Sequence, residues 1–253
     1  MDAERRLEAE RVFSRTYWRS STGLLSLIGS FRRVAYIGLS HAPQTIGQEN
    51  LDYWKSDRTR QLRERVAPGS SPEDMATAQA HRAVVDAQYA VDAASLVLAH
   101  SFLDAALYDY CRVTALACPE LWEEPLLGRN ITLKQAMERS FESLRQELLE
   151  SHLRERIERS SLPAKAGTLY VVCKPPPGWK PYLQVYEYDR ERLARLDDER
   201  HRIVHAPGDP IDLANIQDDL YFINAVLYHF LEMVKWRCGV TVNLAHVFQE
   251  PPG

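Results

Sequence analysis

The chain has 253 residues, of which 45% are hydrophobic and 26% are charged, and its formal net charge at pH 7 is −4. This length suits one large domain or one domain with an added arm, and this composition excludes disordered and fibrous proteins. Because the net charge is mildly negative, a nucleic-acid partner would have to be bound by a local basic surface rather than by the field of the whole molecule.

The cysteines and the N-terminal segment bear on where the protein works. Cys111, Cys118, Cys173 and Cys238 form no C-x-x-C pair and have no histidines at zinc-finger spacing, so we expect reduced thiols and no metal. The first residues are charged, unlike a secretory signal, and the apolar stretch 23–39 contains two arginines and is too short to span a bilayer. We therefore expect a cytoplasmic protein with no membrane contact and no cofactor.

The N-terminal part is predicted to be a helical extension or arm over residues 1–70. Residues 1 to about 37 have the one-sided apolar pattern of one or two helices. Pro43 is expected to break this pattern. The charge-rich segment 51–66 has few apolar positions, which is typical of a solvated helix or a flexible arm.

The longest predicted helix runs from about residue 72 to about 117. Ser71 can cap its start and Pro72 suits the first helical turn. Between residues 84 and 116 the pattern is apolar on most sides, so this helix should be central and buried. A further helix is expected from Thr132, as its cap, to about Ile157.

Two short segments after that helix favour β structure. Residues 168–173 and 183–188 are rich in β-prone side chains, and a Pro-Pro-Pro-Gly turn lies between them. We therefore expect a small β-hairpin at about 167–188, inserted between helices of a domain that spans 71–240.

Two final helices are predicted, followed by a tail over 241–253. The first should stop near His205, because Ala206 precedes Pro207 and Gly208 follows. The second is entered at residues 209–210 and has a heptad-like apolar pattern as far as residue 234. We expect an antiparallel helix pair joined by a tight turn.

Arg200 occupies an unusual place on the first of these helices. At 100° per residue from Leu193, Leu196 lies at about 300°, Ile203 at about 280° and Arg200 at about 340°, so Arg200 is within the apolar stripe. Burying an unpaired charge costs several kcal/mol, so the position implies a carboxylate such as Asp104 or Asp109, an interface, or a cleft that receives an anion.

His201 and His205 lie together on one flank of the same helix, because they are four residues apart. A structural interpretation is a helix-end pair, with His205 interacting with the terminal carbonyl groups. An H-x-x-x-H pair can also bind zinc, but the glutamate of an H-E-x-x-H motif and a third ligand are both missing. We therefore expect no metal.

The hexapeptide 200–205, Arg-His-Arg-Ile-Val-His, resembles the signature of HEPN domains: an arginine, a polar residue, and a histidine after four to six intervening positions. The acidic lead-in 197–199, the helix end and the final amphipathic helix agree with it. Residues 95–107 resemble the central HEPN helix, in which many members have a glutamate; the matching residue here is Asp104, one methylene shorter. The resemblance covers roughly residues 75–238 and implies a mainly α, HEPN-like bundle.

The resemblance also implies a metal-independent endoribonuclease that leaves 2′,3′-cyclic phosphate and 5′-hydroxyl ends. His205 would do the acid/base work, Arg200 would stabilise the phosphorane, and His201 would orient the RNA. HEPN domains commonly dimerise, so a homodimer is expected. Stand-alone members with both residues are often toxins or antiphage effectors, which implies an antitoxin or another regulatory partner. The alternatives are a non-catalytic HEPN module that binds RNA, a nucleotide or a protein, and a purely structural helical dimer.

Overall fold

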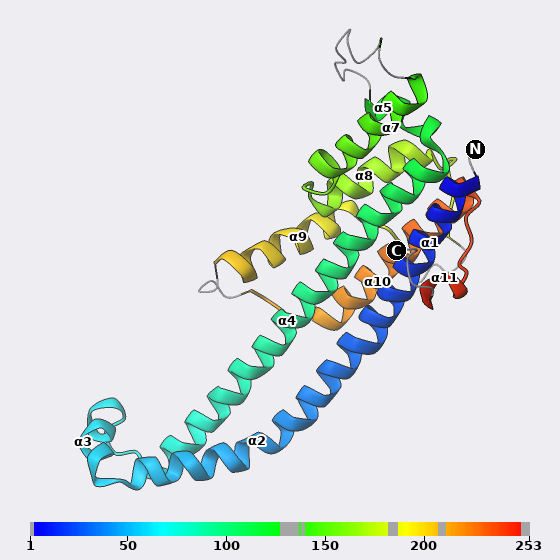
Figure 1. The fold of residues 1–253 in the computed structure, drawn as a ribbon. Coiled ribbons are helices and arrows are strands. Elements are labelled where there is room, and N and C mark those ends of the chain that lie inside the picture. Colours follow the sequence, from blue (N-terminus) through cyan, green and yellow to red (C-terminus); the bar gives the residue numbers. More distant parts are fainter. Residues whose placement is uncertain (1–2, 127–136, 138–139, 182–186, 207–210, 249–253) are drawn as a thin grey trace.

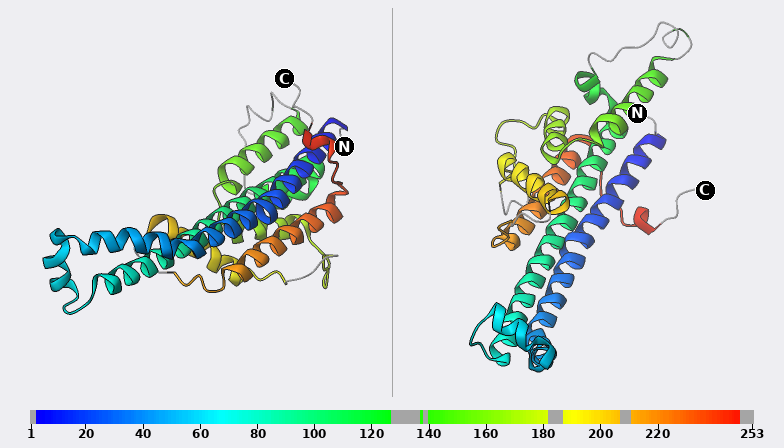
Figure 2. Two further views of the ribbon diagram at one scale, coloured as in Figure 1. Left: turned by 90° about the horizontal axis from the view of Figure 1, so that it is seen from below. Right: turned by 90° about the vertical axis from the view of Figure 1, so that its left-hand side faces the viewer.

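The computed structural model describes residues 3–126, 137, 140–181, 187–206 and 211–248 (Figures 1 and 2). This part of the chain is helical and contains no strand, which confirms the mainly α class. The helices are α1 (Ala3–Ser21), α2 (Gly29–Lys55), α3 (Asp57–Val66), α4 (Pro72–Ala117), α5 (Glu123–Leu126), α7 (Phe141–His152), α8 (Leu162–Cys173), α9 (Arg190–His205), α10 (Ile216–Cys238) and α11 (Ala245–Phe248). Two π-helical segments (Thr22–Ile28 and Leu153–Ile157) and a 3₁₀ turn (Pro119–Trp122) connect some of them.

The central helix is α4, as the sequence predicts. It has 46 residues and is therefore about 69 Å long at 1.5 Å per residue. Its start is a capping box, in which the Ser71 hydroxyl accepts the Asp74 amide and the Asp74 carboxylate accepts the Ser71 amide. The C-terminal half of α4 is surrounded by α1, α8 and α10 (Figure 1).

The core lies where these helices meet. Phe13 of α1, Tyr110 of α4, Leu169 of α8 and Phe230 of α10 are all fully buried in one cluster. Because α1 contributes to this cluster, the segment 1–70 does not form a unit apart from the rest of the chain. The segment is shared between the bundle and a projecting arm.

The arm consists of α2, α3 and the first part of α4, with α2 and α4 side by side (Figures 1 and 2). Between residues 72 and 92 the buried side chains are Ala76 and Ala80, so the arm has little core of its own. At its base, Arg32 and Asp92 form a largely buried ion pair of 2.8 Å. The Tyr36 hydroxyl donates a 2.7 Å hydrogen bond to the same carboxylate.

Pro43 does not break the helix, contrary to the sequence prediction. It lies inside α2, and the helix bends before it reaches α3 (Figure 1). A proline within a helix removes one amide donor and crowds the preceding turn, which usually kinks or ends the helix. Pro43 is exposed on the arm, where water can satisfy the freed carbonyl group, so the helix continues with a bend.

The prediction of a first β-strand in the hairpin, at residues 168–173, is wrong. Residues 168–173 belong to α8, which begins after Ser161 with Pro163 in its first turn. The buried positions of α8 include Leu162, Ala166, Leu169 and Val172, a spacing of three to four residues that fits a helix rather than a strand. The β-branched side chains of this segment are outweighed by burial against α4 and α10. Of the second predicted strand, residues 183–188, the first four (183–186) lie outside the described residues.

The last two long helices are not joined by a tight turn. The helix α9 ends at His205, as predicted, but α10 begins at Ile216, and residues 207–210 of the connection lie outside the described part. The helix α9 packs mainly on α4 and α8. Its link to α10 is polar: Arg192 and Arg195 both reach Asp219, at 2.7 Å and 2.8 Å.

The remaining predicted helix, from Thr132 to Ile157, can be compared over part of its length. Its proposed cap falls on residues outside the described part of the chain. The described helix α7 begins at Phe141, where the Ser140 hydroxyl accepts the Ser143 amide. It continues as the π-helical segment to Ile157, which agrees with the predicted end.

One helix, α4, is long and apolar enough to cross a membrane, by length and composition alone. Half of its most apolar window is buried inside the protein. A central core helix passes the same test, and the packing of α4 against α1, α8 and α10 is that of such a helix.

Candidate functional site

The helix α9 presents the predicted HEPN-like motif. Its start is capped by Asp189, whose carboxylate accepts the amides of residues 191 and 192. Leu193 and Leu196 are buried, and Ile203 packs against the core. Arg200 therefore lies on the inward face of the helix, as the helical count predicts.

Arg200 lines a polar pocket of about 270 Å³ between α4, α8 and α9. The pocket is lined by His100, Ser101, Asp104, Glu158, Ser160, Ser161, Lys165, Asp197 and Arg200. The Nε atom of Arg200 is buried and has no hydrogen-bond partner within the described part of the chain. Leaving a buried donor without a partner is costly, about 1–3 kcal/mol.

His100 and Asp197 form a tight pair in this pocket. His100 Nε2 lies 2.6 Å from the Asp197 carboxylate, and the imidazole is 8% exposed. This hydrogen bond is the main reason why the pKa of Asp197 is lowered, and the backbone amide of Leu162 and the charge of Arg200 add to it. Asp197 of α9 thus contacts α4 through His100 and the start of α8 through Leu162, and it holds the three helices together.

Lys165 and Asp104 form the second pair. The Lys165 ammonium is 1% exposed and donates a 2.6 Å hydrogen bond to Asp104. Asp104 therefore lines the same pocket as Arg200 while its nearest cationic partner is Lys165. The other carboxylate considered as a partner of Arg200, that of Asp109, instead binds Thr16 and Arg19 of α1.

His201 and His205 lie together on the outer side of α9. Their ring centroids are 4.5 Å apart and both residues are exposed. No hydrogen bond joins either imidazole to another residue of the described part of the chain. The structure therefore brings the two histidines together but points the Arg200 side chain into the pocket on the inner side of the helix.

The sequence analysis missed His100 and Lys165. His100 lies one helical turn before Asp104 on α4, a spacing of four that places both on one face and could have indicated a shared site. Lys165 was missed because its segment borders the predicted hairpin. In a helix that starts at Leu162, Lys165 lies on the buried face beside Ala166.

Within the described part of the chain, no three His, Cys, Asp or Glu side chains are placed to hold a metal ion. The four cysteines are free, as expected. No protein-family model, curated protein or solved structure matches this chain. The resemblance to HEPN domains therefore rests on the motif in α9 and its helical setting.

Proposed function

We propose that this protein is a metal-independent endoribonuclease of the HEPN type. The observation that carries the proposal is the exposed His201–His205 pair at the end of α9, on the same helix as Arg200, whose guanidinium faces the inner pocket and has a buried atom without a partner. Two imidazoles at a solvent-facing helix end are side chains of the kind that serve as general acid and base toward a bound RNA.

In the proposed reaction, His205 takes the proton of the ribose 2′-hydroxyl. The 2′-oxygen then attacks the adjacent phosphorus, the bond to the 5′-oxygen breaks, and a proton passes to that leaving oxygen. Arg200 stabilises the charge on the phosphorane through its several N–H donors, and His201 orients the phosphate. The products are a 2′,3′-cyclic phosphate and a 5′-hydroxyl.

We further propose that the active form is a homodimer. Because Arg200 faces inward and the histidines face outward on one chain, two motifs that meet across a symmetry axis would form a more complete site. A cellular role as a toxin or antiphage effector, held in check by an antitoxin or another regulatory partner, follows from the same resemblance.

The direct test is cleavage of mixed RNA by the purified protein in the presence of EDTA, with the new ends analysed for cyclic phosphate. We expect His205→Ala and Arg200→Ala to reduce the rate by about 100-fold or more, the usual contribution of a general acid or base. The matched control is His81→Ala, which removes an exposed histidine of α4 away from the site. Arg200→Lys keeps the charge and separates a loss of catalysis from a loss of folding.

Two outcomes would contradict the proposal: cleavage that persists in both variants, or no cleavage of any RNA by the wild-type protein. In cells, overexpression of the wild type should arrest growth, and overexpression of His205→Ala should not.

The second candidate function is a non-catalytic module that binds RNA, a nucleotide or a protein partner. The observation that favours it is the pocket itself, in which Arg200, Lys165 and His100 converge away from the two exposed histidines. This function predicts binding of RNA or a nucleotide without cleavage. Arg200→Gln would then weaken binding, and His205→Ala would leave it unchanged.

A further inference from the structure

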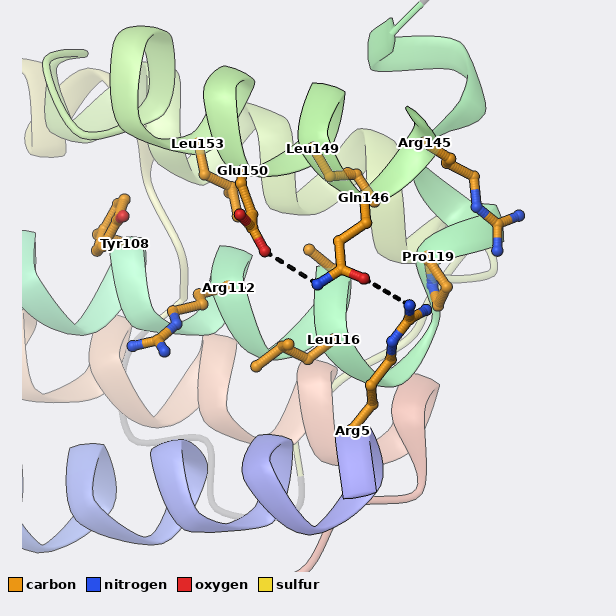
Figure 3. Close-up of a pocket in the computed structure, with 11 residues that line it drawn as sticks. Arg5, Tyr108, Arg112, Leu116, Pro119, Arg145, Gln146, Leu149, Glu150 and Leu153 are labelled. Carbon is orange, nitrogen blue, oxygen red and sulfur yellow. Dashed lines mark hydrogen bonds between the residues drawn. The ribbon is translucent and has the colours of Figure 1, made fainter. Parts of the chain in front are cut away.

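A second pocket lies further toward the C-terminal end of α4, between α1, α4 and α7 (Figure 3). Its volume is about 210 Å³, and it shares no lining residue with the pocket of Arg200. It is lined by Arg5, Tyr108, Arg112, Ala115, Leu116, Pro119, Arg145, Gln146, Leu149, Glu150 and Leu153. The pocket thus combines an apolar floor with a cationic rim.

The floor comes from α4 and from α7 with the π-helical segment that follows it. Leu149 and Leu153 are buried, and Leu116 and Tyr108 face them across the opening (Figure 3). An aromatic ring or a short aliphatic chain would bury apolar surface here, which is favourable by about 25 cal/mol per Å².

The rim carries three arginines from three helices, and one acid, Glu150, lines the pocket with them. Two of these guanidinium groups have loose ionic partners: Arg5 lies 4.0 Å from Glu142, and Arg112 lies 3.5 Å from Glu8. Exposed pairs at such distances contribute little, so Arg112 can turn to a ligand at small cost. Arg145 is paired more closely, at 2.8 Å from Glu142, and Arg5 also donates a hydrogen bond to Gln146.

Glu150 accepts a hydrogen bond from a neutral amide and keeps its negative charge, so it offsets one of the three arginines. Gln146 Nε2 donates to Glu150 at 3.0 Å, while Gln146 Oε1 accepts from Arg5 at 2.6 Å (Figure 3). The amide therefore bridges the acid and one arginine. This bridge also links α7 to α1.

We propose that this pocket binds a small amphipathic anion, an aryl or short-chain acyl group that carries a carboxylate or a phosphate. The apolar part would lie on the leucines, and the anionic group would take the arginines of the rim, whose planar fork of donors suits both oxyanions. A cavity of about 150 Å³ accommodates benzene. The volume here leaves room for one ring with its acidic group, whereas a whole nucleotide would protrude.

The proposal is independent of RNA cleavage, because the two sites share no residue and the pocket contains no histidine. It is tested by calorimetric titration of the full chain with four probes. Phenylacetate and phenyl phosphate carry both features, phenylacetamide lacks the charge, and inorganic phosphate lacks the ring. We expect the two aryl anions to bind, and phenylacetamide and inorganic phosphate to bind more than tenfold more weakly. The preference between the two aryl anions distinguishes a carboxylate from a phosphate ligand.

The matched variants are Arg112→Gln in the rim and Arg82→Gln on the arm, where the side chain is 85% exposed. Loss of a charged hydrogen bond should weaken the aryl anions about tenfold in Arg112→Gln, and Arg82→Gln should bind as the wild type does. Thermal unfolding of each variant verifies that it is folded. The proposal is overturned if neither aryl anion binds at about 10 mM, if phenylacetamide binds equally well, or if folded Arg112→Gln retains full affinity.

Discussion

His229 of α10 is surrounded by aromatic side chains. Its Nε2 lies 2.6 Å from the Tyr170 hydroxyl. The Tyr188 ring stacks on the imidazole with 5.5 Å between ring centroids, and the Trp179 ring lies in an edge arrangement with 5.3 Å between centroids. Burial lowers the pKa of His229 from its usual 6.5 to about 4. The folded protein therefore keeps this imidazole neutral at a pH where the unfolded chain protonates it.

This difference predicts a loss of stability in mild acid. Below pH 6.5 the unfolded state binds a proton that the folded state does not bind until about pH 4, so the free energy of unfolding falls across that window. Since His229 is partly exposed, solvent screening leaves a contribution of about 2 kcal/mol. Urea unfolding at pH 7 and pH 4.5 should show a smaller loss for His229→Gln than for the wild type. The exposed His81→Gln should lose as much as the wild type, and an equal loss in all three would contradict the prediction.

The four cysteines differ from one another in the pKa of their thiols. The Cys238 thiol donates a hydrogen bond to the Cys118 sulfur and thereby lowers the pKa of Cys118, which is partly exposed at the end of α4. The same hydrogen bond, together with burial, raises the pKa of Cys238. Burial raises the pKa of Cys173 to about 12 and also raises that of Cys111.

Because the thiolate is the reactive form, Cys118 should react first with a thiol reagent. A limiting dose of iodoacetamide at about pH 8 is expected to label Cys118 at least tenfold faster than the other three, as read by mass spectrometry of the peptides. Cys118→Ser should remove the fast phase. Rapid labelling of Cys173 in the folded protein would contradict the prediction.

At the scale of single residues, the sequence predicts which face of α9 Arg200 occupies, because helical periodicity is local. It does not predict the partners of that face. His100 lies 97 residues from Asp197, and Lys165 lies 61 residues from Asp104. Such pairs depend on how α4, α8 and α9 pack, and no local pattern encodes that.

At the scale of elements, two of the wrong predictions, the break at Pro43 and the strand at 168–173, have one physical origin. Proline in the pattern of α2 and β-branched side chains in the pattern of α8 are local preferences of about 1–3 kcal/mol. In α8, burial against neighbouring helices outweighs the β preference. In α2, the surrounding helical turns and the solvent outweigh the effect of proline. The elements without such a conflict, α4 and the end of α9, are predicted correctly.

Pro43 is therefore a local weakness of α2. Pro43→Ala restores an amide donor and removes a clash, and it should stabilise α2 by up to about 3 kcal/mol. Hydrogen exchange of the amides near residue 43 should slow, and the thermal transition should rise or remain unchanged. Pro68→Ala, in the turn after α3, has no such clash to relieve and is the control. Faster exchange in Pro43→Ala would show that the bend is required for packing.

At the scale of the whole molecule, the apolar face predicted for the N-terminal helices is largely uncovered. Leu27 precedes α2, and Phe31, Val34 and Ile37 of α2 follow it, each more than 40% exposed. They recur every three or four residues, so they form one stripe along the base of the arm. A second copy of the chain packed on this stripe would bury it, so the stripe is a candidate interface for a homodimer.

The dimer is tested by sedimentation equilibrium. We expect a mass twice that of one chain for the wild type and a single-chain mass for Val34→Lys, because a charge in the centre of the stripe would have to be desolvated. Leu62→Lys, at the exposed tip of the arm, should remain dimeric. A monomeric wild type, or a dimeric Val34→Lys, would place the stripe outside any interface.

The projecting arm also affects which method can measure the mass of the protein in solution. A chain of 29.0 kDa with a two-helix rod on one side sweeps out a larger volume as it tumbles than a sphere of equal mass. A single copy would leave a gel-filtration column early and look like a pair. Its rotational correlation time and frictional ratio would be raised in the same way. A gel-filtration profile alone would thus reflect the elongated shape of the chain rather than the number of copies.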